Sequence, residues 1–150
     1  MQLINIKRGI IFFGIFTLFL YSCKDKKAEQ KQLQEEVMKV HDELMMEMGK
    51  LMENKKELNT LSINMDSLKM KNASLDTAQL QQKIQVTNLG LTKADDAMMA
   101  WMNNFNPDYT GKSQDEIMSY LKDEKVKIDS VKTLFKKSLS TSGAILIQYK

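Results

Sequence analysis

The sequence contains few of the residues on which catalytic sites and disulfide frameworks depend. Its 150 residues include one cysteine, one histidine and one proline. It has no glycine-rich phosphate loop, no pair of cysteines, and no serine, histidine and aspartate at the spacing of a known catalytic motif. A single imidazole leaves little means of activating a nucleophile. We therefore expect a protein that is not an enzyme and that carries no cofactor.

The N-terminal segment has a pattern of its own. Two basic residues, Lys7 and Arg8, precede an uncharged run of 13 residues. This run is short for a membrane-spanning helix, which needs about 20 apolar residues. The small residue Ser22 and the only cysteine, Cys23, follow the run. A basic start, a short apolar run and a small residue before the cut are typical of a secretory signal. We expect residues 1–22 to be a signal peptide.

The end of this segment, Leu20-Tyr21-Ser22-Cys23, resembles the lipobox of bacterial lipoproteins. In proteins with that motif the cysteine sulfur is diacylated, the chain is cut just before the cysteine, and the new amine is acylated. The resemblance implies cleavage between Ser22 and Cys23 and a lipid anchor on Cys23. Several acyl chains hold far better than one, because each buried methylene contributes about 0.8 kcal/mol. The alternative is an uncleaved anchor helix in which Cys23 has no role.

Removal of the signal changes the charge balance. The chain has 22 basic and 19 acidic residues, and two of the basic ones lie in the signal, so the mature chain is nearly neutral. It also lacks arginine, the usual residue for binding phosphates and base edges. We therefore expect no nucleic-acid partner. Lys24, rather than an aspartate, follows the cysteine. By resemblance to the sorting rule of Gram-negative lipoproteins, this favours the outer membrane, on its periplasmic or its surface face.

The rest of the chain has the period of helices. Residues 23–32, which include the lipidated cysteine, are charged and are expected to form a solvated tether. Beyond them, apolar residues recur at alternating intervals of three and four, which places them on one face of a helix. Three such seams are present: Leu33, Val37, Val40, Leu44, Leu51, Leu58, Leu61, Met65 and Leu68; Leu80, Ile84, Leu91, Ala94, Met98, Trp101 and Phe105; and Ile117, Leu121, Ile128, Val131 and Phe135. Polar residues interrupt the seams at Glu47, Asn54, Thr87 and Glu124.

The helix boundaries follow from the residues between the seams. Asn106-Pro107 ends the second helix, because proline disfavours helical geometry in the residue before it. Ser113 and Glu116 form a capping box that starts the third. The boundary between the first two helices falls at 72–76, with Ser74 or Asp76 as the cap. We predict an all-α fold, an antiparallel three-helix bundle at 33–142 with a long, coiled-coil-like first helix, followed by a C-terminal tail at 143–150.

A second stripe lies beside the seam of the first helix. Its members are Met38, His41, Met45, Met48 and Met52. We favour packing as its role, because methionine fills irregular gaps and contacts aromatic rings such as that of Trp101. A second interpretation is an adaptable groove for a partner helix or an apolar ligand. A third is a copper(I) site formed by His41, Met45, Met48 and Met52, because thioethers and imidazole suit that ion.

A family resemblance rests on three stretches: HDELMMEMGKL (41–51), DDAMMAWMNNF (95–105) and YLKDEKVKIDSV (120–131). They resemble a group of small, uncharacterised helical lipoproteins of Bacteroidota-type bacteria, some of which are labelled "viral A-type inclusion protein". The resemblance extends to about Ser140 and implies a lipid-anchored helical domain, with no known activity. Three short motifs also resemble the O-glycosylation acceptor of such bacteria, at Ser67, Thr77 and Ser130. Helix capping and surface polarity are the alternative explanation of these motifs.

The expected function is therefore that of a lipid-anchored helical protein of the cell envelope. It would act by binding or scaffolding, with another protein or an envelope component as its partner and with the membrane reached through the lipid. The alternative is a periplasmic or surface copper(I)-binding lipoprotein that uses the stripe of His41 and methionines.

Overall fold

The computed structural model describes the backbone of residues 5–149 and the side chains of residues 26–149. These described residues form four helices: α1 (Asn5–Ile63), α2 (Met65–Lys71), α3 (Thr77–Asn104) and α4 (Gln114–Tyr149). Residues 5–149 contain no strand, so the predicted all-α class is confirmed. None of the described helices has an apolar stretch long enough to cross a membrane. The side chains of Ser22 and Cys23, where cleavage and lipidation are expected, lie outside the described residues.

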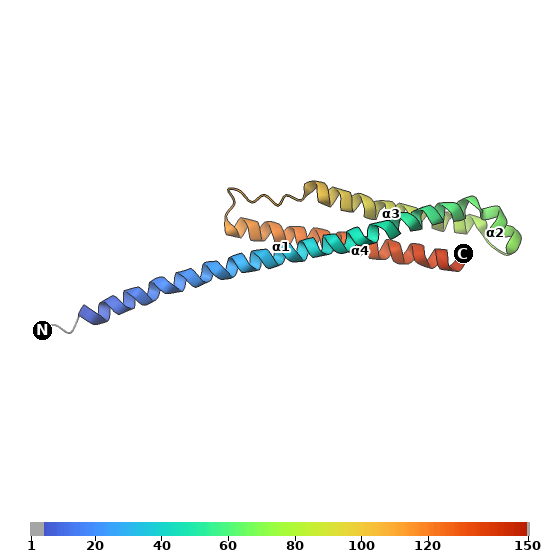
Figure 1. Cartoon of the computed structure of the whole chain (residues 1–150). Coiled ribbons are helices and arrows are strands. Elements are labelled where there is room, and N and C mark those ends of the chain that lie inside the picture. The colour runs from blue at the N-terminus through green and yellow to red at the C-terminus, as the bar shows by residue number, and fades with distance from the viewer. Residues whose placement is uncertain (1–4, 150) are drawn as a thin grey trace.

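The two longest helices, α1 and α4, run in the same direction (Figure 1). Three side-chain contacts join them along their length: Lys26 to Asp115, Glu43 to Lys132, and Asn54 to Ser142. The partners are 89, 89 and 88 residues apart in the sequence. A constant separation means that the helices are parallel and stay in register from one end of the contact to the other.

Helix α3 comes before α4 in the sequence and runs in the opposite direction to both α1 and α4 (Figure 1). Its first half lies beside the end of α1, where Ser62 donates to Gln81 at 2.9 Å and Asn88 donates to Asn59 at 2.8 Å. Its last turns lie beside the middle of α1. Figure 1 places α2 and the C-terminus at the end of the molecule farthest from the N-terminus. We call that end the distal end, and the end that holds the α3–α4 loop the proximal end.

The predicted seams form the core of the bundle. On α3 every seam residue from Leu80 to Trp101 is buried, and Phe105 is half-buried. On α4 every seam residue from Ile117 to Phe135 is buried, including the interrupting Glu124. On α1 the buried seam residues are Val37, Val40, Leu44, Leu51, Asn54 and Leu58. Removal of this apolar surface from water is the main force that holds the helices together.

The sequence pattern predicted that the first helix continues to residue 71, but the structure divides it into two helices. It ends at Ile63, and Asn64, with φ −90° and ψ 20°, separates it from α2. Two backbone bonds still bridge the break, from the Asn64 N–H to Thr60 and from the Leu68 N–H to Asn64. The seam therefore continues across the break, with Met65 and Leu68 half-buried. No residue of α2 is fully buried.

Both ends of the expected bundle extend farther than predicted. Residues 26–32, expected in the tether, belong to α1, and the Gln114 amide donates to Gln30 at 2.9 Å. The expected tail is helical to Tyr149, because α4 continues through residues 143–149 and buries Ile145 and Leu146. The apolar seam of α4 reaches these two residues through Ser138 and Ser142, which sequence reasoning did not count as core.

The predicted caps are confirmed. The Ser113 N–H donates to the Glu116 carboxylate at 2.8 Å, and the Glu116 N–H donates to the Ser113 hydroxyl at 3.4 Å, which completes the capping box. Hydrogen bonds from the hydroxyl and the N–H of Ser113 lower the pKa of Glu116. Asp76 caps α3 by accepting from the Gln79 N–H at 2.9 Å. Helix α3 ends at Asn104, before Pro107.

Candidate functional site

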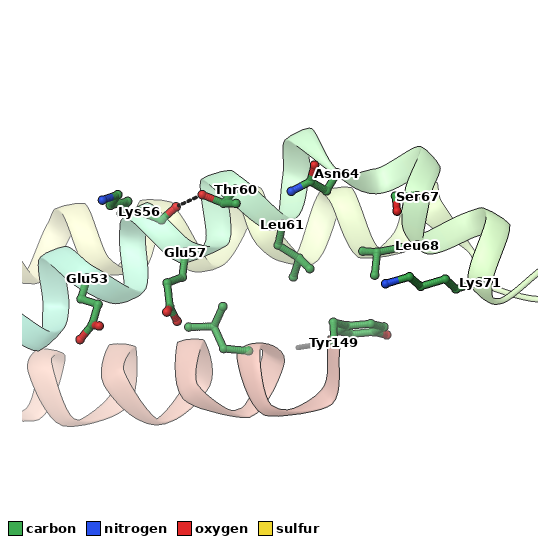
Figure 2. A pocket seen from close by; sticks show the side chains of 11 residues that line it. Glu53, Lys56, Glu57, Thr60, Leu61, Asn64, Ser67, Leu68, Lys71 and Tyr149 are labelled. Carbon is green, nitrogen blue, oxygen red and sulfur yellow. Dashed lines mark hydrogen bonds between the residues drawn. The ribbon is translucent and has the colours of Figure 1, made fainter.

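A groove of about 520 Å³ lies at the distal end, between α1, α2 and the last turns of α4 (Figure 2). Its volume is in the range of sites that bind small molecules or side chains of a partner, about 300–1,000 Å³. We call it the distal groove. It is lined by Glu53, Lys56, Glu57, Thr60, Leu61, Asn64, Ser67, Leu68, Lys71, Leu146 and Tyr149.

The groove exists because two irregular features meet there. The break at Asn64 separates α2 from α1, and α2 buries none of its residues fully. Across from it, α4 reaches its last turn at Tyr149. Leu61 and Leu68 extend from α1 and α2 toward α4, and Tyr149 lies opposite them (Figure 2). Leu61, Leu68 and Tyr149 are half-buried. The groove therefore has an apolar floor that water still reaches.

Charged side chains stand at the two ends of this floor. Glu53 and Glu57 extend from α1 toward α4 at one end, and the Lys71 side chain reaches back over Tyr149 at the other (Figure 2). The polar residue Thr60 is already used, because its hydroxyl donates to the Lys56 carbonyl at 3.1 Å. The lining is therefore apolar in the middle, with Glu53, Lys56 and Glu57 at one end and Lys71 at the other.

A polar layer crosses the core just before the groove. Asn54 donates to the Ser142 hydroxyl at 2.8 Å, and that hydroxyl donates to the Leu139 carbonyl at 3.1 Å. One turn earlier on α4, the Ser138 hydroxyl donates to the Gly90 carbonyl at 3.0 Å. Thr87 of α3 is also buried. These hydrogen bonds replace apolar contacts at seam positions, so the distal end buries less apolar surface.

The proximal end has a ladder of aromatic rings instead. Ring centroids lie 5.7 Å apart from His41 to Trp101, 4.9 Å from Trp101 to Phe105, and 6.2 Å from Phe105 to Tyr120. Tyr109 meets Tyr120 edge-on at 6.1 Å. Burial, and then the neighbouring Tyr120 and Glu124, raise the pKa of Tyr109. Trp101, a member of the second predicted seam, is 6% exposed, and its ring lies beside that of His41 of α1.

The stripe of histidine and methionines is only partly packed. Met38 and Met48 are half-buried against the core, as the packing interpretation predicts. Met45 and Met52 are 42% and 50% exposed, so packing does not account for them. Half-buried His41 contacts the Asp42 carboxylate through Nδ1 at 2.9 Å. Among the side chains of residues 26–149, no three of the types histidine, cysteine, aspartate and glutamate come together as a metal site.

The three hydroxyls of the glycosylation motifs lie in different settings. Ser67 is exposed on α2 and lines the distal groove. Thr77 is half-buried as the first residue of α3, directly after the capping Asp76. Ser130 is exposed in the middle of α4, and its hydroxyl donates to the Val126 carbonyl at 2.8 Å.

Sequence reasoning missed the distal groove. Lys71, Leu146 and Tyr149 were assigned to a helix end and to a tail, where nothing suggested that they would meet. One signal was available, because the seam spacing that ends at Phe135 continues through Ser138, Ser142, Ile145 and Tyr149. Comparisons of the chain with protein-family models, with curated proteins and with solved structures find no match.

Proposed function

We propose that this chain is a lipid-anchored helical protein of the cell envelope, which binds a partner at its distal groove and catalyses no reaction. The observation that carries the proposal is the position of the groove. It lies at the end of the molecule farthest from the N-terminus, and therefore far from the proposed anchor at Cys23 (Figure 1). At a rise of about 1.5 Å per residue, the helix between Cys23 and Glu53 is about 45 Å long.

In this proposal the helices act together as an antiparallel three-helix bundle, with α1 and α2 forming one long, coiled-coil-like arm. The contacts that keep α1 and α4 in register stiffen the arm between anchor and groove. The proposed location is the outer membrane, on its periplasmic or its surface face. The lipobox resemblance and the resemblance to small helical lipoproteins of Bacteroidota-type bacteria support this location. The proposed partner is a protein or another envelope component, reached from a membrane-held base.

The anchor is tested with radiolabelled palmitate in intact cells. The wild-type protein should incorporate the label, and Cys23→Ala should lose both the label and the membrane association. A Cys23→Ala protein that stays in the membrane fraction as before would contradict the anchor.

The groove is tested by photo-crosslinking in the same cells, with a photoreactive amino acid at Leu68. A probe at Ser130, exposed on α4 and outside the groove lining, is the matched control. A discrete crosslinked product from position 68, absent from position 130, would support binding at the groove. Equal products from both positions would contradict it.

A second candidate function is binding of copper(I), and the exposure of two thioethers favours it. Met45 is exposed on α1 one turn after half-buried His41, and Met52 is exposed about two turns beyond Met45. Thioethers and imidazole are ligands that select this soft ion. The test is competition with a copper(I) chelator without oxygen, with wild type and with Met45→Leu/Met48→Leu. Stoichiometric uptake that is lost in the double variant would support the candidate, and no uptake above background would exclude it.

A further inference from the structure

One side of α1 faces α3 along the whole length of their contact. Three side-chain contacts define that side, and they join Ser62 to Gln81, Asn59 to Asn88, and His41 to Trp101. Residues three, four or seven positions apart share one side of a helix. Met45 comes one turn after His41 on α1. Its thioether therefore also lies on the side of α1 that faces α3.

The side of α3 that faces α1 carries two more methionines. Gln81 and Asn88, which bond to α1, are seven positions apart, and Met102 lies two heptads beyond Asn88. Its side chain is half-buried against the core. Met99, one turn before Met102, is 47% exposed, at the outer edge of the same side. Both thioethers therefore lie toward α1.

The antiparallel register brings the residues of the two helices to the same level. The Trp101 ring lies beside that of His41, and Met102 follows Trp101 in the sequence. One turn forward on α1 leads from His41 to Met45, and one turn back on α3 leads from Met102 to Met99. Packed helices have axes about 8–10 Å apart, a gap that two long side chains span from opposite sides. Four donor side chains therefore converge between α1 and α3.

The hydrogen bond of His41 leaves its other ring nitrogen free for a metal ion. Nδ1 lies 2.9 Å from the Asp42 carboxylate. A carboxylate only accepts hydrogen bonds, so Nδ1 carries a proton, and Nε2 of the neutral imidazole keeps its lone pair. Histidines that bind metals almost always donate their second N–H to a carboxylate, a carbonyl or water. His41 is therefore held in the tautomer that a metal ligand needs.

The chemistry of these donors selects the ion. Three thioethers and one imidazole are soft, uncharged ligands, which favour copper(I) over harder cations. The aromatic ring of Trp101 adds to this preference, because a cation within about 6 Å of an indole face is attracted to it. Its centroid is 5.7 Å from that of His41.

We propose that one copper(I) ion binds between α1 and α3, with His41, Met45, Met99 and Met102 as its ligands. The inference rests on the second candidate function, because it names the residues that hold the ion. It replaces Met52, about two turns beyond Met45 on α1, by the methionines of α3. It does not depend on a partner at the distal groove.

The first test is a titration of the full chain in lipid nanodiscs with copper(I) and a competing chelator, without oxygen. Wild type should form a 1:1 complex that changes the fluorescence of Trp101, the only tryptophan. Met99→Leu/Met102→Leu should bind about a hundredfold more weakly or less, because even groups outside the ligand set contribute about 10- to 100-fold. Met46→Leu/Met52→Leu, which replaces two exposed methionines of α1 outside the proposed site, should bind like wild type.

A gain of signal identifies the donors even if a leucine variant folds poorly. X-ray absorption of the wild-type complex should show sulfur neighbours and one imidazole. Met99→His, at a position that is 47% exposed, should add a second imidazole, because imidazole also binds copper. Met52→His, at a position of α1 that is 50% exposed, should leave the number of imidazoles at one. Circular dichroism checks that each variant is as helical as wild type.

Two results would overturn the ligand set and leave the second candidate function in place. They are copper(I) binding that is lost in Met46→Leu/Met52→Leu instead of Met99→Leu/Met102→Leu, and a second imidazole that appears in Met52→His instead of Met99→His. A wild-type protein that forms no copper(I) complex would overturn the inference and the second candidate together. The crosslinking experiment at Leu68 is independent of all three results, because it tests only the distal groove.

Discussion

The proximal and distal ends of the bundle are built from the same three-four seam, but they are filled differently. The proximal end is closed by large side chains, with the ring ladder from His41 to Tyr120 and fully buried Leu121. The distal end has a polar core layer, a broken helix and an open groove. The most exposed large apolar residues also lie at the distal end: Ile63, Met70 and Ile147, at 83%, 81% and 85%. The same seam pattern is therefore compatible with both a closed end and an open one, and the break at Asn64 and the end of α4 leave the distal end open.

Because of this difference, most of the stabilising contacts lie at the proximal end, and the groove lies at the distal end. The ring ladder and the buried seam residues stabilise the proximal end, which is the end nearer the proposed anchor, while exposed ion pairs such as Lys26–Asp115 contribute little. The distal end has fewer buried apolar side chains, so its local opening should cost less free energy than global unfolding. If the groove binds a partner, as proposed, easier local opening at this end would help to admit it.

The largest expected effect comes from core truncation at the proximal end. Leu44 is 2% exposed, so Leu44→Ala should lower the free energy of unfolding by about 2–5 kcal/mol, through lost burial and the cavity that remains. Leu68→Ala at the distal end should cost about 1 kcal/mol or less, because the side chain is half-buried and faces the open groove. Urea unfolding followed by Trp101 fluorescence measures both. Equal costs would contradict the proposed difference between the two ends.

An intermediate effect is expected from the polar layer. Ser142→Ala removes the acceptor of the Asn54 amide and should cost about 1–3 kcal/mol, because a buried donor is left without a partner. Asn54→Leu combined with Ser142→Ala should recover most of the loss, because both polar groups are then gone. A thermodynamic cycle over the two single variants and the double variant gives the coupling. If the double variant loses as much stability as the two single variants together, Asn54 and Ser142 are not energetically coupled.

A smaller effect of opposite sign is expected from glycines inside helices. A Cβ at Gly143 would meet no atom within 4 Å, so Gly143→Ala should stabilise α4 by about 0.5–1 kcal/mol. Gly49→Ala, equally uncrowded on α1, is the control nearer the proximal end. Hydrogen exchange should show slower opening of the distal amides in Gly143→Ala and not in Gly49→Ala. Similar profiles in the two variants would show that the ends do not open separately.

The smallest effect is the pH dependence of a surface ion pair. The Lys132 hydrogen bond, 2.6 Å long, and the charge of that lysine lower the pKa of Glu43 below its ordinary value of 4.5. The stabilisation is therefore fully present above pH 4.5 and is lost as the pH falls through the lowered pKa. Glu43→Gln should be slightly less stable than wild type at neutral pH and equal to it in acid. A difference that persists unchanged in acid would exclude the ion pair as its cause.

The seams of α3 and α4 could be predicted from the sequence because apolar residues occupy all but one position of each seam, at regular intervals of three and four residues. Thr87 and Glu124 interrupted the pattern and are nevertheless buried in place. The prediction failed where packing with another helix decided the outcome. Nothing near Asn64 is a proline or a glycine, so the break has no local signal. The predicted seam of α4 ends at Phe135, and serines at 138 and 142 occupy the positions at which its spacing continues.

The candidate site was less predictable than the fold. A groove needs residues from α1, α2 and α4 at one place, and a periodic pattern within one helix does not give the distance between helices. The stripe of Met38 to Met52 shows the same limit. Its spacing places all members on one side of α1, yet neighbouring helices cover Met48 and leave Met52 half exposed. The anchor motif is different, because a short local sequence carries it.

The parallel pairing of α1 and α4 also affects how the chain folds. The side-chain contacts described between these helices join residues 84 to 89 positions apart, so a loop of that length has to close before any of them forms. Most helical bundles fold quickly because neighbouring helices are also neighbours in sequence, and contacts of long separation slow folding. Synthesis proceeds from the N-terminus, so α1 is complete long before its main partner exists. We therefore expect α3 and α4 to pair first and the first helix to dock last, with its apolar seam exposed to chaperones and proteases in the interval.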